Sequence, residues 1–372
     1  MKRLSEMSQK QGASDKGWDK DFVHVRRRRI LILASLPAVL AGIALLALFI
    51  GTIGPIGPGD PVRLTWGEAI YAILHGHGDW PANYHVIFWD VRVPRILLAG
   101  LVGAALACAG TAMQAVFRNP MADPFIVGVS SGASLGAVLA GLSSLATMAV
   151  IGSIISPLLA FVMAIITVFA VYWLGTVKGR VYVDTLLLSG VAMAALIGAV
   201  VSFLIYYSRQ EYHRIIFWLL GSLSLASWTS VGVLALAVAM GVVCIFLYSR
   251  DLNALLLGEE TAHNLGTDPE FLKTLMLVMA AVMTSAAVAF TGVIGFVGLI
   301  IPHMMRLVVG ADHRILVPAA TVSGAAFLIA ADSLARTVIP GDELPVGIIT
   351  ALCGGPFFLF LLRRSRTRGE PV

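Results

Sequence analysis

The stretch RVPRILLAGLVGAALACAGTAMQAVFRNPMADPFIVGVSSGASLG, Arg92 to Gly136, decides the fold. It opens with two arginines, and an uncharged segment rich in Gly and Ala then runs from Ile96 to Phe117. About 20 apolar residues are enough to cross a bilayer as a helix, and small side chains let neighbouring helices approach closely. The stretch therefore predicts a membrane helix packed against protein, with arginines at one end and a polar turn, 118–124, at the other.

The residues of this stretch leave two interpretations open. One is a tightly packed bundle helix with ordinary flanking charges, and the other is a helix that takes part in transport. Composition places the whole chain in the membrane, because 58% of its residues are hydrophobic and only 13% are charged, whereas soluble domains carry roughly 25% charged residues. The net charge of +5 gathers at the two ends, which indicates membrane orientation and not nucleic-acid binding.

Both ends of the chain are basic and are expected in the cytoplasm, because positive residues favour that side. Arg26 to Arg29 close a polar N-terminal tail, and RRSRTR, 363–368, lies near the C-terminus. An even number of spans follows, so the long uncharged run 274–305 is interpreted as two spans. About ten spans result: 30–50, 96–117, two within 125–177, 184–207, 229–248, two within 274–305, 315–331 and 344–362.

The predicted fold class is thus an all-α polytopic membrane protein with both termini cytoplasmic. Three parts are expected: a basic cytoplasmic tail 1–29, a ten-span domain 30–364, and a second cytoplasmic tail 365–372. Within the domain, Asp332 and Arg336 lie one helical turn apart and are expected to pair. Arg92, Arg95 and Arg336 fall on the outside, where arginines need a special reason.

The most polar interior segment, RDLNALLLGEETAHNLGTDPE, runs from Arg250 to Glu270. Its leucines and the glycine at 258 predict two short helices joined at Gly258. A solvated loop would not need so many leucines, so we expect a docking surface for another protein.

Several classes of function are weakened by what the sequence lacks. No chain of intramembrane carboxylates suggests a proton or sodium path, which counts against a secondary transporter. The phosphate-loop pattern G-x-x-x-x-G-K-[ST] is not in the sequence, so this route to ATP hydrolysis is not open to the chain itself. A receptor or scaffold without transport remains a rival. ATP-dependent uptake would distinguish a transporter powered by a separate ATPase from both of these classes.

The sequence resembles the permease subunits of type II ABC importers for iron siderophores, haem and cobalamin. The runs that carry the resemblance are long and cover most of 30–364: RVPRILLAGLVGAALACAGTAMQ (92–114), RNPMADPFIVGVSSGASLG (118–136), LLGEETAHNLG (256–266), GVIGFVGLIIPHMMR (292–306) and DELPVGIITALCGGPFF (342–358). The resemblance implies ten spans in a homodimer, with the pore at the dimer interface in the cytoplasmic (inner) membrane.

The resemblance also implies partners and residue roles. A binding protein outside would dock on Arg92, Arg95 and Arg336, and two cytoplasmic ATPases, which hold the ATP and Mg²⁺, would engage coupling helices at about 251–268. No cofactor or metal is implied in this chain. The implied coupling residues are Leu256, Gly258, Glu259, Glu260, Leu265 and Gly266, and the implied cytoplasmic gate residues are Asn119, Met121, Asp184 and Thr185.

The resemblance does not single out one substrate. We expect an iron chelate, either a ferric siderophore or haem, because that class is the broadest in the family, and cobalamin is the alternative. Met121 stands where the family more commonly has leucine, which is a mild departure in the implied gate.

Overall fold

The computed structural model describes residues 31–49, 86–143, 149–208, 212–339 and 342–368. The predicted N-terminal tail 1–29 lies outside the described residues, as does most of the segment between the first two predicted spans. The predicted C-terminal tail begins inside α15, which continues to Arg368. A first helix, Leu31–Phe49, matches the first predicted span.

Helices make up nearly all of the described chain, with one short hairpin between two of them. The first half contains η1 (Val86–Arg92), α4 (Val93–Val116), η2 (Pro124–Val127), α5 (Val129–Leu142), α6 (Ala149–Gly175), β1 (Thr176–Val177), β2 (Arg180–Val181), α7 (Val183–Ser208) and α8 (Tyr212–Leu219). The second half contains α9 (Trp228–Leu247), α10 (Ser249–Leu256), α11 (Glu259–Asn264), α12 (Pro269–Thr291), α13 (Val297–Val309), α14 (His313–Ala335) and α15 (Val346–Arg368). In the antiparallel hairpin Thr176 lies opposite Val181, and Val177 lies opposite Arg180.

Seven of the described helices are long and apolar enough to cross a membrane, and three shorter apolar helices are α5, α13 and most of α15. The two long uncharged runs divide as the sequence predicted. Residues 125–177 hold α5 and α6, and residues 274–305 hold most of α12 and α13 with a break at 292–296. Gly292 makes this break possible, because it adopts φ +68° where an L side chain would be strained. The number of actual crossings stays a prediction.

Helix α4 lies at the centre of the bundle and packs against α14, α12, α9 and α13. Its small residues explain the close packing. A Cβ added at Gly103 would lie 2.1 Å from the carbonyl oxygen of Gly324 on α14, so only glycine fits at this crossing. The sequence prediction of a membrane helix packed against protein is confirmed, because 83% of the apolar window in Val86–Val116 is buried.

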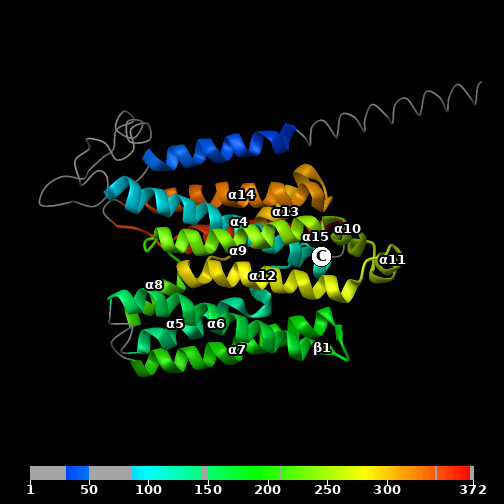
Figure 1. Cartoon of the computed structure of the whole chain (residues 1–372), viewed down its shortest axis with the longest axis horizontal. Helices are drawn as coiled ribbons and strands as arrows, with labels where there is room; N and C mark the ends of the chain where they lie inside the picture. Colours follow the sequence, from blue (N-terminus) through cyan, green and yellow to red (C-terminus); the bar gives the residue numbers. More distant parts are fainter. Residues whose placement is uncertain (1–30, 50–85, 144–148, 209–211, 340–341, 369–372) are drawn as a thin grey trace, which may run out of the picture.

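Figure 1 shows the long helices running roughly parallel, with α10, α11 and the β-hairpin at one end of the bundle. We call this the α11 end. The start of α4, the end of α14 and α8 lie at the opposite end, which we call the α8 end. The first helix starts, and α15 finishes, at the α11 end. Each end carries a cluster of charged side chains.

Candidate functional site

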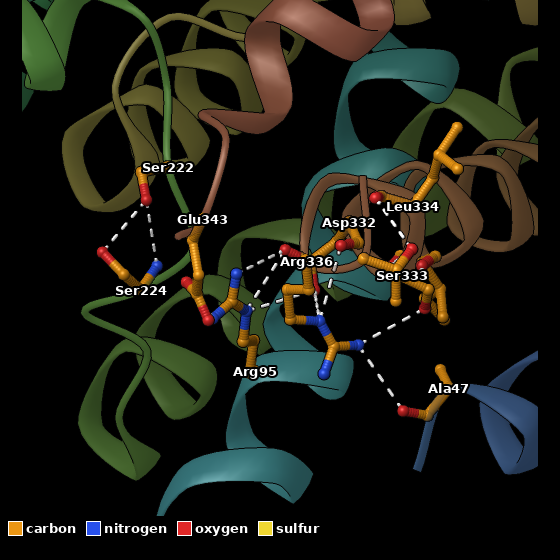
Figure 2. Close-up of polar contacts among 11 residues, drawn as sticks. Ala47, Arg95, Ser222, Ser224, Asp332, Ser333, Leu334, Arg336 and Glu343 are labelled. Atoms are coloured by element: carbon orange, nitrogen blue, oxygen red, sulfur yellow. Dashed lines mark hydrogen bonds and ion pairs between the residues drawn. The ribbon is translucent and has the colours of Figure 1, made fainter. Parts of the chain in front are cut away.

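The first cluster lies at the α8 end and is built around Arg95 in the first turns of α4 (Figure 2). The guanidinium donates from Nε and Nη2 to the Asp332 carboxylate, with a shortest distance of 2.9 Å from Nη2 to Oδ1. Its Nη1 donates to the Glu343 carboxylate at 2.8 Å. Asp332 lies in the last turn of α14, and Glu343 lies on the connection to α15, so Arg95 ties three elements together.

Two further arginines complete this arginine cluster, which we define as Arg92, Arg95, Asp332, Arg336 and Glu343. The Nε of Arg336 lies 3.1 Å from Asp332 Oδ2, so the predicted pairing of these two residues is confirmed. Arg336 also donates to the carbonyl oxygen of Ala47, and Arg92 donates to that of Leu48. Both carbonyls end the first helix, where the helix dipole favours positive charge.

Burial separates the members of the arginine cluster. The three arginines and Asp332 are buried, whereas the Glu343 side chain is 44% exposed. Sequence reasoning gave Arg336 a partner in Asp332 but none to Arg95, and the structure places both Asp332 and Glu343 on Arg95. It also missed Glu343, although an acidic residue ahead of the last apolar helix, in the run DELPVG, was the available signal. The predicted docking role of Arg92, Arg95 and Arg336 stays a prediction.

The second cluster lies at the α11 end, and we call it the lysine cluster: Arg118, Glu259, Glu270 and Lys273. Lys273 is fully buried on α12, and its Nζ lies 2.7 Å from Glu270 Oε1 and 3.2 Å from Glu259 Oε1. Arg118, just past the end of α4, lies 3.9 Å from the same Glu259 oxygen. Glu259 begins α11, so the cluster connects that helix to α12 and to the turn after α4.

A cavity of about 450 Å³ opens beside the lysine cluster. All four cluster residues line it, together with the end of the β-hairpin and the start of α7. The hairpin is fixed to α12, because Glu270 Oε2 accepts from the backbone N–H of Val181 at 2.7 Å. The structure therefore brings the end of α4, the start of α7 and the start of α11 to one place.

The predicted gate residues are only partly gathered at this cavity. Asp184 is exposed and lines it, whereas Asn119, Met121 and Thr185 do not belong to its lining. Asn119 instead shapes the turn, because its Oδ1 accepts from the backbone N–H of Met121 at 2.8 Å. Arg118 enters the turn with φ +46°, a conformation that costs an L residue energy.

The same turn contains Asp123, whose carboxyl group has a raised pKa. Burial raises the pKa of Asp123 to about 6, although a hydrogen bond from the backbone N–H of Phe125 acts in the opposite direction. Asp123 also caps η2 through that bond, at 2.8 Å.

The predicted pair of short helices joined at Gly258 is confirmed as α10 and α11. Gly258 turns the chain with φ +116°. Helix α10 is amphipathic: Leu252 and Leu255 are buried against the bundle, while Leu256 and Leu257 are exposed. Three further residues assigned to this surface, Glu260, Leu265 and Gly266, are also exposed. An exposed apolar surface on a short projecting helix pair is typical of a protein interface.

A link that the sequence did not reveal fixes α10 to the start of α14. Asn253 donates from Nδ2 to Asp312 Oδ1 at 2.7 Å, and its Oδ1 accepts from the backbone N–H of His313 at 2.9 Å. Burial acts to raise the pKa of the Asp312 carboxyl, but the bonds from Asn253 and Arg314 and the nearby positive charges hold it below its usual value. Helix α14 thus joins the α10 link at one end to the arginine cluster at the other.

A polytopic helical chain with a buried charge cluster at one end and a projecting helix pair at the other has the arrangement expected of a membrane transport permease. The chain belongs to the FecCD transport family, which matches residues 38–364. It is a multi-pass membrane protein and a permease of the ABC transporter class, whose permease subunits are not themselves catalytic.

Three comparisons illustrate this membership. The chain is 50% identical over 288 residues to a cobalamin import system permease of Halobacterium salinarum, covering 77% of this chain and 76% of the relative. It is 41% identical to a hemin transport system permease of Yersinia pestis, covering 77% and 85%. A solved metal-chelate type ABC transporter in an inward-facing conformation superposes with a TM-score of 0.74 at 31% identity, covering 90% of this chain and 99% of that one.

Proposed function

We propose that this chain is the permease subunit of a binding-protein-dependent ABC importer, that it crosses the membrane ten times, and that it works as a homodimer with both termini in the cytoplasm. The observation that carries the proposal is the α10–α11 pair, which projects from the bundle with exposed leucines and is tied to the bundle by Asn253 and Glu259. A surface of this kind fits a soluble partner that moves.

The α11 end would face the cytoplasm, and each copy of the chain would engage one ATPase there. ATP and Mg²⁺ would bind on that partner, and this chain would perform no chemistry. Closure of the two ATPases would move α11. Because Glu259 meets both Lys273 and Arg118, that movement would reach α12 and the turn after α4. We place the cytoplasmic gate at this turn, with Asn119, Met121, Asp184 and Thr185 as its candidate residues.

The α8 end would face outward and receive the binding protein. Arg92, Arg95 and Arg336 bring three positive charges against two negative ones, Asp332 and Glu343, so the cluster is positive overall. Acidic groups on the binding protein would then set its orientation and speed its encounter with the permease.

The substrate class is a large metal chelate. A relative named as a cobalamin import permease is 50% identical to this chain, and a relative named as a hemin permease is 41% identical. Cobalamin is therefore the first compound to test, ahead of the iron chelates that the sequence favoured. A path with few fixed charges suits such cargo, because charged residues in a membrane span are costly and would hold a chelate back.

Reconstitution in proteoliposomes tests this proposal. The chain would be incorporated with candidate ATPase subunits and given candidate binding proteins loaded with radiolabelled cobalamin or a ferric chelate. We expect uptake that requires ATP and both partners and that stops with a non-hydrolysable ATP analogue. Uptake driven by a sodium or proton gradient without the ATPase would instead identify a secondary transporter.

A further inference from the structure

Arg95 presents two edges to its surroundings, and the two edges differ in chemistry. Nε and Nη2 form one edge and donate to Asp332, at 3.1 and 2.9 Å. This is the paired geometry in which a guanidinium binds a carboxylate most strongly. Nη1 lies on the other edge and donates to both oxygens of Glu343, at 3.1 and 2.8 Å. Figure 2 shows the two carboxylates on different sides of the guanidinium.

The two carboxylates also differ in their access to water. The Asp332 side chain is 2% exposed and is shared with Arg336, so its departure would leave buried Arg336 without a carboxylate partner, which is costly. The Glu343 side chain is 44% exposed, and it lies on the connection between α14 and α15, not within a helix. Pairs with one well-solvated member contribute little to stability and are exchanged readily.

Access to Arg95 is therefore controlled by Glu343. The Arg95 side chain is 9% exposed, and its solvent-side donor is already occupied. A carboxylate arriving from outside can reach Nη1 only by taking the place of Glu343. The inner edge, held by Asp332, keeps the guanidinium oriented during such an exchange.

We infer that Glu343 is an internal stand-in for an acidic side chain of the binding protein, and that docking replaces the Glu343–Arg95 contact with a contact between proteins. This inference rests on the proposed function and names a residue of the docking surface that the sequence did not reveal. Exchange of one ion pair for another adds little affinity, so docking stays reversible. It adds specificity, because a partner without a carboxylate at this point cannot displace Glu343.

The test measures docking of the binding protein that supports uptake in the reconstitution above. Nanodiscs would carry the permease with its ATPases, and binding would be followed by biolayer interferometry. In Glu343→Gln the amide competes less well for Arg95, so we expect Kd to fall about two- to fivefold, which corresponds to the strength of one exposed ion pair. Asp342→Asn is the matched control, because it removes the neighbouring negative charge while keeping an acceptor for the Glu343 backbone N–H.

Each outcome decides the inference. Tighter docking of Glu343→Gln with unchanged docking of Asp342→Asn supports it. Equal or weaker docking of Glu343→Gln shows that Glu343 is only a structural partner and overturns it, as does equal tightening in both variants, which is a general charge effect. If Glu343→Gln fails to fold, Glu343→Asp is measured, and its shorter carboxylate should tighten docking by a smaller factor. If neither the unsubstituted chain nor Arg95→Gln binds the binding protein, both the proposed function and this inference are contradicted.

Discussion

The arginine cluster and the lysine cluster lie at opposite ends of the bundle, and their side chains differ in exposure to water. In the arginine cluster both members of the Arg95–Asp332 pair are almost fully buried, at 9% and 2% exposure of the side chains. In the lysine cluster only Lys273 is buried, while Glu259 and Arg118 are 40% and 47% exposed. The first arrangement holds its shape, and the second can open at little cost.

This difference fits the two tasks that we propose. A surface that recognises a carrier protein binds more tightly when its side chains are already fixed, because binding then costs less conformational entropy. A connection between a moving helix and a gate gains instead from exposed partners that can exchange. Glu259 lies between Lys273 and Arg118 and can favour either one as α11 moves.

The largest expected effect comes from breaking the buried cluster. Asp332→Asn removes the carboxylate that serves both Arg95 and Arg336, so Arg336 loses its carboxylate partner and Arg95 keeps only the half-exposed Glu343. We expect the free energy of unfolding to fall by about 3–5 kcal/mol. Denaturant titration of the purified protein in detergent measures it, with Asp342→Asn as the exposed control. A loss below about 1 kcal/mol would show that the cluster is not held as tightly as its burial implies.

The next effect concerns the turn at the α11 end. Asp123 has a pKa of about 6, against 3.8 in the unfolded chain, so the folded state binds its proton more tightly. The contribution of Asp123 to the free energy of unfolding should therefore fall by up to about 3 kcal/mol as pH rises from about 4 to about 6. Above about pH 6 this contribution should stay constant. Asp123→Asn keeps the η2 cap. We expect this variant and the unsubstituted chain to have equal free energies of unfolding at pH 4, where Asp123 is protonated. A difference that does not change with pH would contradict the raised pKa.

A third prediction concerns the close crossing of α4 and α14. Gly103→Ala forces a methyl group against the Gly324 carbonyl oxygen and should cost about 1–3 kcal/mol. Gly232→Ala on α9 is the control, because nothing lies within 4 Å of the added Cβ. Thermal unfolding of the two variants in the same detergent compares them. Equal melting temperatures would mean that α4 and α14 are not locked together at this crossing.

The smallest effect on stability belongs to the lysine cluster. Glu259→Gln removes the exposed partner of Arg118 and Lys273 and should cost less than about 1 kcal/mol. Salt should reduce even this difference, because exposed pairs are screened. We nevertheless expect ATP-dependent uptake to fall in the variant, since the contact from α11 to the turn is lost. Loss of stability comparable to that of Asp332→Asn would remove the contrast between the two ends.

Much of this architecture was predictable from the sequence, because apolar length and charge act locally. The breaks within 125–177 and 274–305 and the hinge at Gly258 were all marked by glycine or by small residues between apolar runs. The pairing of Asp332 with Arg336 was predictable for the same reason, since it needs only helical spacing.

The contacts that were missed join residues far apart in the chain. Glu343 meets Arg95 across 248 positions, and Asn253 meets Asp312 across 59. Neither pair leaves a periodic signal, because its geometry depends on how α4, α10 and α14 pack together. Sequence reasoning identified the arginines of the proposed docking surface and the pairing of Asp332 with Arg336, but not the contacts of Arg95 with Asp332 and Glu343.

The central claim is that the two clusters face opposite aqueous compartments, and thiol labelling tests it most directly. Asp342→Cys and Leu257→Cys would be introduced separately after replacement of the native cysteines, and sealed right-side-out vesicles would be treated with a membrane-impermeant maleimide. We predict that Asp342→Cys is labelled at once and that Leu257→Cys is labelled only after the vesicles are opened. Labelling of both positions from the same side of sealed vesicles would contradict the account.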